Sequence, residues 1–227
     1  MIFNYGVDTL TINKVNSVLN GATKGRLTLE ATEKVIACRK KVEVLAGSNK
    51  AVYGINTGFG PLCDVQITKE ETCKLQENLL ITHAVGVGNP IDKKLSKLMM
   101  ICKVHALCQG YSGIRLKVIE RILYFIDNNL LPVVPEQGSV GASGDLAPLS
   151  HLFLPLIGEG EFWIDNKIVS AKTVLKEHNL KPIELQAKEG LALINGTQFI
   201  LAHAIAGLTK MEYLLDLADV AGAMSIE

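Results

Sequence analysis

Residues 138–151 read GSVGASGDLAPLSH, and the interpretation of the whole chain starts from this stretch. It places glycine at 138, 141 and 144, directly before an apolar segment that predicts a helix over 147–156. Glycine-rich loops before helices often bind phosphate through backbone N–H groups. The spacing here is G-x-x-G-x-x-G, which matches neither the dinucleotide-binding nor the Walker pattern, and the loop contains no lysine. A phosphate site is therefore the weaker interpretation, and a plain turn-forming loop is the simplest one.

The tripeptide Ala142-Ser143-Gly144 supports a chemical interpretation of the same loop. If the backbone is compressed, the amide nitrogen of Gly144 can attack the carbonyl carbon of Ala142 and close a five-membered ring. Loss of water from the ring, and of the Ser143 hydroxyl, leaves an exocyclic methylene conjugated to the ring. Glycine admits strained backbone and leaves its nitrogen uncrowded. Alanine keeps the attacked carbonyl accessible, and serine supplies the leaving group.

The stretch closely resembles the signature of the aromatic amino acid ammonia-lyases and aminomutases. Their prosthetic group, 4-methylidene-imidazole-5-one (MIO), forms from an Ala-Ser-Gly triplet. Further blocks that resemble this family are YGINTGFG at 53–60, THAVGVG at 82–88, GYSGIR at 110–115 and KEGLALINGTQ at 188–198. The resemblance implies that MIO forms autocatalytically from Ala142, Ser143 and Gly144, with no external cofactor. No metal is expected, because the histidines at 105, 151, 178 and 203 do not form a metal-binding spacing.

The resemblance also implies roles for three side chains outside the loop. Tyr53 matches a tyrosine on a mobile loop that performs acid–base work at the substrate. Asn195 matches an asparagine that hydrogen-bonds the MIO carbonyl, where one well-placed donor can be worth ~3 kcal/mol. His83 matches a substrate-selecting position. Without the resemblance, the three residues would be read as a loop anchor, a helix-end histidine and an Asn-Gly turn, although a turn is unexpected inside the long helical pattern around Asn195.

The pair Thr82-His83 indicates the substrate. The resemblance associates Ser-His at these positions with action on histidine, Phe-Leu with phenylalanine and His-Leu with tyrosine. Threonine keeps the hydroxyl of serine, and a polar pair suits an imidazole held by hydrogen bonds. The resemblance thus implies elimination of ammonia from L-histidine to give trans-urocanate. Phenylalanine or tyrosine ammonia-lyase and aminomutase activities stay open, and Arg115 is a candidate partner for a carboxylate.

Composition restricts the class of protein. The chain has 227 residues, 48% of them hydrophobic, and a formal net charge of +0, so it carries no electrostatic footprint for nucleic acid. The N-terminus lacks the pattern of a signal peptide, and apolar runs such as 152–157 are too short for a membrane span. Without a CxxC pair, the cysteines predict buried, reduced thiols of a cytoplasmic protein. They stand at positions 38, 63, 73, 102 and 108.

Hydrophobic periodicity predicts a mainly α fold, with a loop-rich catalytic region over 1–186 that leads into a long-helix bundle over 187–227. A strand is expected at 7–13, a β-hairpin at 161–170 and a structureless functional stretch at 131–145. The expected helices of the first region are 29–46, 69–84, 93–109, 114–128, 147–156 and 172–177.

The last residues, ADVAGAMSIE at 218–227, contain no helix stop signal, so the helix is expected to continue beyond Glu227. The resemblance implies a homotetramer whose active sites draw on more than one subunit. It also implies a further tyrosine, an arginine and a glutamate that have no counterpart in this sequence. Two hypotheses follow: the chain is an amino acid ammonia-lyase, or the N-terminal part of one, with a small-molecule amino acid as substrate, or it is an inactive helical fragment of such an enzyme.

Overall fold

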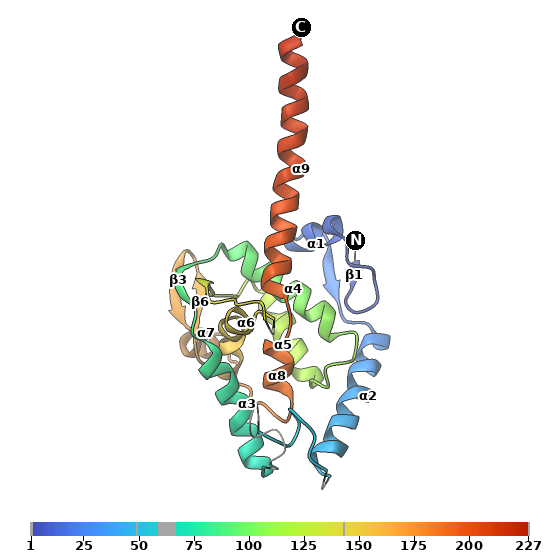
Figure 1. Cartoon of the computed structure of the whole chain (residues 1–227), viewed down its shortest axis with the longest axis vertical. Coiled ribbons are helices and arrows are strands. Elements are labelled where there is room, and N and C mark those ends of the chain that lie inside the picture. The colour runs from blue at the N-terminus through green and yellow to red at the C-terminus, as the bar shows by residue number, and fades with distance from the viewer. Residues whose placement is uncertain (1, 49, 59–66, 143, 227) are drawn as a thin grey trace.

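The computed structural model describes residues 2–48, 50–58, 67–142 and 144–226. They form a largely helical body from which one long helix, α9, projects (Figure 1). The mainly α prediction is confirmed. The helices are α1 (Ile12–Leu19), α2 (Leu29–Ala46), α3 (Lys69–His83), α4 (Lys93–Leu107), α5 (Leu116–Asp127), α6 (Leu146–Phe153), the 3₁₀ helix η2 (Leu154–Ile157), α7 (Ala171–Glu177), α8 (Glu189–Ile194) and α9 (Gln198–Ile226).

Short strands connect the helices at the edge of this body. The strands are β1 (Ile2–Asn4), β2 (Lys24–Arg26), β3 (Val87–Pro90), β4 (Leu131–Pro132), β5 (Pro135–Gln137), β6 (Glu161–Ile164) and β7 (Lys167–Ser170). β1 and β2 pair in parallel, whereas β3 pairs antiparallel with β5, and β4, β6 and β7 form an antiparallel sheet. The predicted hairpin is confirmed as β6–β7. Its turn residues Asp165 and Asn166 both have positive φ, at 46° and 66°, as tight hairpin turns require.

Helix starts followed the sequence signals closely. The Thr68 hydroxyl accepts from the backbone N–H of Glu71 at 3.2 Å, and the Glu71 carboxylate accepts from the N–H of Thr68 at 2.9 Å. This capping box starts α3 as predicted. Asp92 caps α4 by accepting from the N–H of Lys94 at 2.7 Å.

Two expectations about the secondary structure of residues 1–186 are wrong. No strand forms over 7–13, because Thr11 caps the N–H of Lys14 and starts α1 at Ile12. The stretch 131–145 is not structureless, since it contains β4 and β5. Their partners are β6 and β3, which lie elsewhere in the sequence, so local periodicity carried no signal for them.

α4 lies at the centre of the core, where it contacts α1, α5 and the first turns of α9. Residues 98–101 on α4 are almost completely buried. Cys102 and Cys108 are buried too, and burial raises the pKa of each thiol to about 12. The prediction of buried free thiols is confirmed for these two. Cys38 and Cys73 are only half-buried, and Cys63 lies outside the described residues.

Most of α9 has no partner within the described chain. Ala202 and Ile205 are buried against the body, whereas the later turns are exposed (Figure 1). The segment Glu189–Ile226 is long and apolar enough to cross a membrane, contrary to the expectation from uninterrupted apolar runs. α9 nevertheless carries four charged side chains, and each costs roughly 3 kcal/mol at a bilayer centre. They are Lys210, Glu212, Asp216 and Asp219.

Candidate active site

A cavity of about 250 Å³ lies where the loop over 138–144 meets the C-terminal end of α3. The structure therefore brings Thr82 and His83 together with Ala142 and Gly144, although the two pairs are far apart in the sequence. Ser143 lies outside the described residues. The residues that line the cavity are Thr82, His83, Val85, Gly138, Val140, Ala142, Gly144, Leu146 and Ala147.

Gly144 is held against a second loop. Its φ is +98°, and a Cβ at this position would lie 2.4 Å from the carbonyl oxygen of Gly196. The N–H of the next residue, Asp145, donates to the same oxygen at 2.7 Å. Only glycine satisfies both the backbone conformation and this close approach. The end of the triplet is thus packed directly on the residues that follow α8.

Residues 195–197 interrupt the helix that was expected from Ala187 onward. α8 ends at Ile194 and α9 begins at Gln198, while Asn195 has a ψ of 116° and Gly196 a φ of +151°. The Asn-Gly pair therefore makes a turn, as its composition favours. The apolar pattern on both sides concealed the break. Asn195 is followed directly by Gly196, whose carbonyl lies against Gly144. The role of the Asn195 side chain at the triplet stays a prediction.

Asp145 connects the loop to the start of α9, a role that no pattern in the sequence indicated. Its carboxylate is fully buried and accepts from the Ser139 hydroxyl at 2.7 Å. It also accepts from the backbone N–H groups of Phe199 at 2.9 Å and Ile200 at 3.0 Å. These amides belong to the first turn of a helix and have no partner within it. A negative charge there is also favoured by the helix dipole.

Replacing Asp145 with alanine is expected to lower the free energy of unfolding by about 2–4 kcal/mol, because three donors lose a charged acceptor. Asp145→Asn is the matched control, since its amide oxygen still accepts from α9 and its amide N–H₂ can donate to Ser139. We expect a clearly smaller loss for this variant. Denaturant unfolding of both variants measures the difference, and equal losses would contradict a capping role.

Thr82 and His83 line the cavity, and their hydrogen bonds to the backbone show which of their atoms can accept from a ligand. The Thr82 hydroxyl donates to the carbonyl of Asn78 at 2.8 Å, so its oxygen can still accept, and His83 Nδ1 lies 3.3 Å from it. His83 Nδ1 lies 2.8 Å from the carbonyl of Leu79. A carbonyl only accepts, so Nδ1 carries the proton, and in the neutral ring the acceptor is Nε2. The pair can therefore offer acceptors to a polar ligand.

The chain just after His83 is fixed by His151 on α6. His151 Nε2 accepts from the backbone N–H of Gly86 at 3.0 Å. A Cβ on Gly86 would lie 3.1 Å from both this nitrogen and the carbonyl oxygen of Gln137. His151 therefore connects the helix that follows the triplet to the wall of the cavity formed by Thr82 and His83.

This bond predicts a pH response. Burial lowers the pKa of His151 from its ordinary 6.5, so the folded state favours the neutral ring that accepts from Gly86. Below about pH 6.5 the unfolded state binds the proton first, and stability falls with pH until the folded pKa is passed. We expect the Gly86 amide resonance to shift along the His151 titration. A Gly86 shift that ignores this titration would contradict the bond.

His105 requires a control, because burial lowers its pKa as well and it accepts from the N–H of Gly6 at 3.2 Å through Nδ1. The His151→Gln variant should lose part of the pH dependence of stability and keep the part that belongs to His105. The Gly6 amide reports on His105 separately in the same titration.

Tyr53 and Arg115 lie apart from the cavity wall. Tyr53 is on the turn over 53–56, is 56% exposed and is not among the described residues that line the cavity. Arg115 pairs with a carboxylate, as considered from the sequence, but the partner is the chain's own Glu189. Two guanidinium nitrogens donate to the Glu189 oxygens at 2.8 Å and 2.6 Å. This pair joins the start of α5 to α8.

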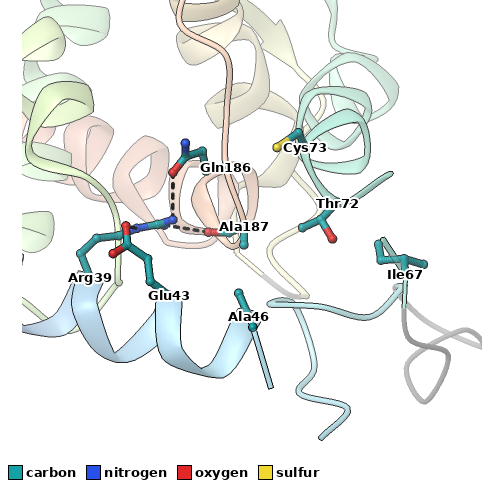
Figure 2. A pocket seen from close by; sticks show the side chains of 9 residues that line it. Arg39, Glu43, Ala46, Ile67, Thr72, Cys73, Gln186 and Ala187 are labelled. Carbon is teal, nitrogen blue, oxygen red and sulfur yellow. Dashed lines mark hydrogen bonds and ion pairs between the residues drawn. The ribbon is translucent and has the colours of Figure 1, made fainter. Parts of the chain in front are cut away.

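A larger cavity, of about 510 Å³, lies between α2, α3 and the segment before α8 (Figure 2). The guanidinium of Arg39, which lines this cavity, already donates to Glu43, to Gln186 and to the carbonyl of Ala187 (Figure 2). The charge is thus compensated within the chain. None of the residues lining this cavity belongs to the loop over 138–144. The smaller cavity is therefore the candidate active site.

Comparison with known proteins identifies the family. A family model described as aromatic amino acid lyase matches residues 10–227. The chain belongs to the aromatic amino acid lyase family. The resemblance of its sequence blocks to this family is thereby confirmed.

Individual members of the aromatic amino acid lyase family show how much of the protein the chain covers. The histidine ammonia-lyase of Staphylococcus saprophyticus is 45% identical over 207 residues, 91% of this chain and 42% of the relative. The crystal structure of histidine ammonia-lyase from Trypanosoma cruzi matches with a TM-score of 0.89 and 37% identity, over 97% of this chain and 43% of that one. Tyrosine aminomutase from Streptomyces globisporus matches with a TM-score of 0.82 and 34% identity, over 89% and 38%. The chain spans less than half the length of these relatives.

Proposed function

We propose that the chain is the MIO-bearing part of a histidine ammonia-lyase, a carbon–nitrogen lyase that converts L-histidine to trans-urocanate and ammonia. One observation carries the proposal: Thr82 and His83 line the same cavity as Ala142 and Gly144. A substrate-selecting pair and the source of the electrophile thus face one space. The names of relatives such as the Staphylococcus saprophyticus enzyme support histidine as the substrate.

The described residues fit a ring formed from Ala142, Ser143 and Gly144. Gly144 has a positive φ and sits where a side chain would collide with the Gly196 oxygen, so its nitrogen stays uncrowded, and Ala142 is exposed to the cavity. When present, MIO supplies an electrophilic methylidene carbon that activates the amine or the aromatic ring of the substrate. The protein supplies the positioning and the surroundings.

Each site residue receives a role that its surroundings allow. Thr82 and His83 offer acceptors that suit the N–H group of an imidazole, and a phenyl ring would leave them unpaired. Asn195 acts as the donor to the ring carbonyl, because the residue that follows it, Gly196, lies against Gly144. Tyr53 removes the substrate's β-proton. Because Tyr53 is not on the described cavity wall, its role requires the turn over 53–56 to move toward the cavity.

The projecting helix supports the proposal of a homotetramer. The later turns of α9 expose a set of large apolar side chains, and such a surface is typical of an interface between chains. The set includes Met211, Leu214, Leu215, Val220 and Met224. We place the catalytic region at 1–186 and the start of a central bundle at 187–227, in a cytoplasmic enzyme.

Adding L-histidine and monitoring the absorbance of urocanate tests the reaction. Faster turnover of phenylalanine or tyrosine would overturn the substrate and favour the other members of the family. The alternative, an inactive fragment, is tested by intact mass. A mass lower by two water molecules without turnover means that the ring forms but the pocket is incomplete. The full mass of the unmodified sequence means that the chain does not close its own ring.

A further inference from the structure

Lys103 is an ionisable residue within the buried stretch over 98–104 of helix α4. Only 2% of its surface is exposed, and no ion pair to it occurs among the described residues. Burial lowers the pKa of its amine to about 7. An amine in such a place destabilises the fold unless it binds a partner. A methionine of similar length would fill the same space without this cost, so the contact that Lys103 makes is informative.

The partner of Lys103 lies at the turn between α8 and α9. Lys103 Nζ donates to the carbonyl oxygen of Asn195 at 2.8 Å. This carbonyl follows the last residue of α8, where backbone acceptors lose their helical donors. The next carbonyl, that of Gly196, is the one that accepts from the Asp145 N–H and contacts Gly144. One hydrogen bond therefore connects the core of the protein to the backbone under the triplet.

We propose that Lys103 is a positioning residue that holds the Asn195–Gly196 turn against the Ala142–Gly144 triplet. The inference deepens the proposed function and rests on it, because the triplet and Asn195 have their roles there. Lys103 acts through Asn195 and Gly196, since it is not among the described residues that line the cavity. The Nζ–H donor of Lys103 fixes the carbonyl of Asn195, and thereby directs its side chain and the carbonyl of Gly196.

Lys103→Met removes the donor and keeps the apolar stem. Lys97→Met is the matched control on the same helix, because the Lys97 amine donates to the side chain of Asn129 at 2.6 Å, away from the turn. Lys103→Arg keeps a cationic donor. The first measurement is amide hydrogen exchange of the 227-residue chain at Asp145, whose N–H is bound by Gly196. The Ile183 N–H, bound by Leu156 at 2.7 Å, is the reference for global opening.

We expect Asp145 to exchange roughly tenfold faster or more in Lys103→Met, with little change at Ile183, because the hydrogen bond from Lys103 is lost locally. Lys97→Met should leave Asp145 unchanged, and Lys103→Arg should restore most of its protection. Unchanged exchange of Asp145 in a folded Lys103→Met variant would overturn the proposal. If that variant does not fold, Lys103→Gln decides in the same way, because its shorter donor cannot reach Asn195.

Intact mass separates this inference from the proposed function. If the parent chain loses two water molecules, we expect the modified fraction to fall several-fold in Lys103→Met and not in Lys97→Met. Equal modification of both variants would overturn the positioning role. If the parent chain keeps its full mass, ring formation in this chain fails. The exchange experiment then still decides whether Lys103 holds the turn.

Discussion

Under the proposed function, replacing Ser143 with alanine is expected to prevent the loss of two water molecules and to abolish ammonia elimination. Alanine has no leaving group on its β-carbon, so the exocyclic methylene cannot form even if the ring closes. The reaction then loses its electrophile, and the remaining residues can only bind and orient the substrate. The loss of kcat should amount to several orders of magnitude, whereas the binding of histidine should change little. Intact mass measures whether the electrophile forms, and urocanate absorbance measures the loss of kcat.

Cysteine is the control for this substitution, because its thiol also provides a leaving group at the same carbon. We expect Ser143→Cys to retain a mass deficit and part of the activity. If Ser143→Ala eliminated ammonia as fast as the parent, the self-formed electrophile would be excluded. The Ser143→Ala variant is expected to fold, because the contacts that hold the loop are made by Asp145, through its N–H and its carboxylate.

The chemistry of the loop could be predicted from the sequence because it depends on adjacent residues. Ala142, Ser143 and Gly144 supply the carbonyl, the leaving group and the nitrogen within one tripeptide. Thr82-His83 was also predicted as part of the site, although only through the resemblance of its sequence block. No spacing rule connects residue 82 to residue 142, and the cavity that joins them results from the packing of α3 against α6.

The contacts that support the loop could not be predicted, because they are made by backbone groups distant in sequence. Asp145 lies within the glycine-rich stretch over 138–151, yet its distant partners are the amides of Phe199 and Ile200. The Asn195–Gly196 turn was hidden in an apolar pattern with a helical period. Local propensity favoured a turn, and the pattern around it favoured a helix. The tertiary contacts with Lys103 and Asp145 are consistent with the turn.

A pair of glycine substitutions separates backbone conformation from close packing in this loop. Gly144 and Gly141 both have positive φ, at +98° and +74°. A Cβ on Gly144 would lie 2.4 Å from the Gly196 oxygen, whereas a Cβ on Gly141 would meet nothing within 4 Å. We expect Gly141→Ala to lower the free energy of unfolding by about 1 kcal/mol, the cost of positive φ alone. Gly144→Ala should lower it by about 2–4 kcal/mol, because the Asn195–Gly196 turn must also move.

The same pair should differ more in chemistry than in stability. Gly144→Ala crowds the nitrogen that attacks Ala142 and displaces the turn beneath it, so ring formation should be abolished. Gly141→Ala leaves that nitrogen and the Gly196 contact in place, and its mass deficit should match that of the parent. Denaturant unfolding and intact mass of the two variants check both statements. Loss of the ring in Gly141→Ala as well would mean that flexibility of the whole loop, rather than the contact of Gly144 with Gly196, controls cyclisation.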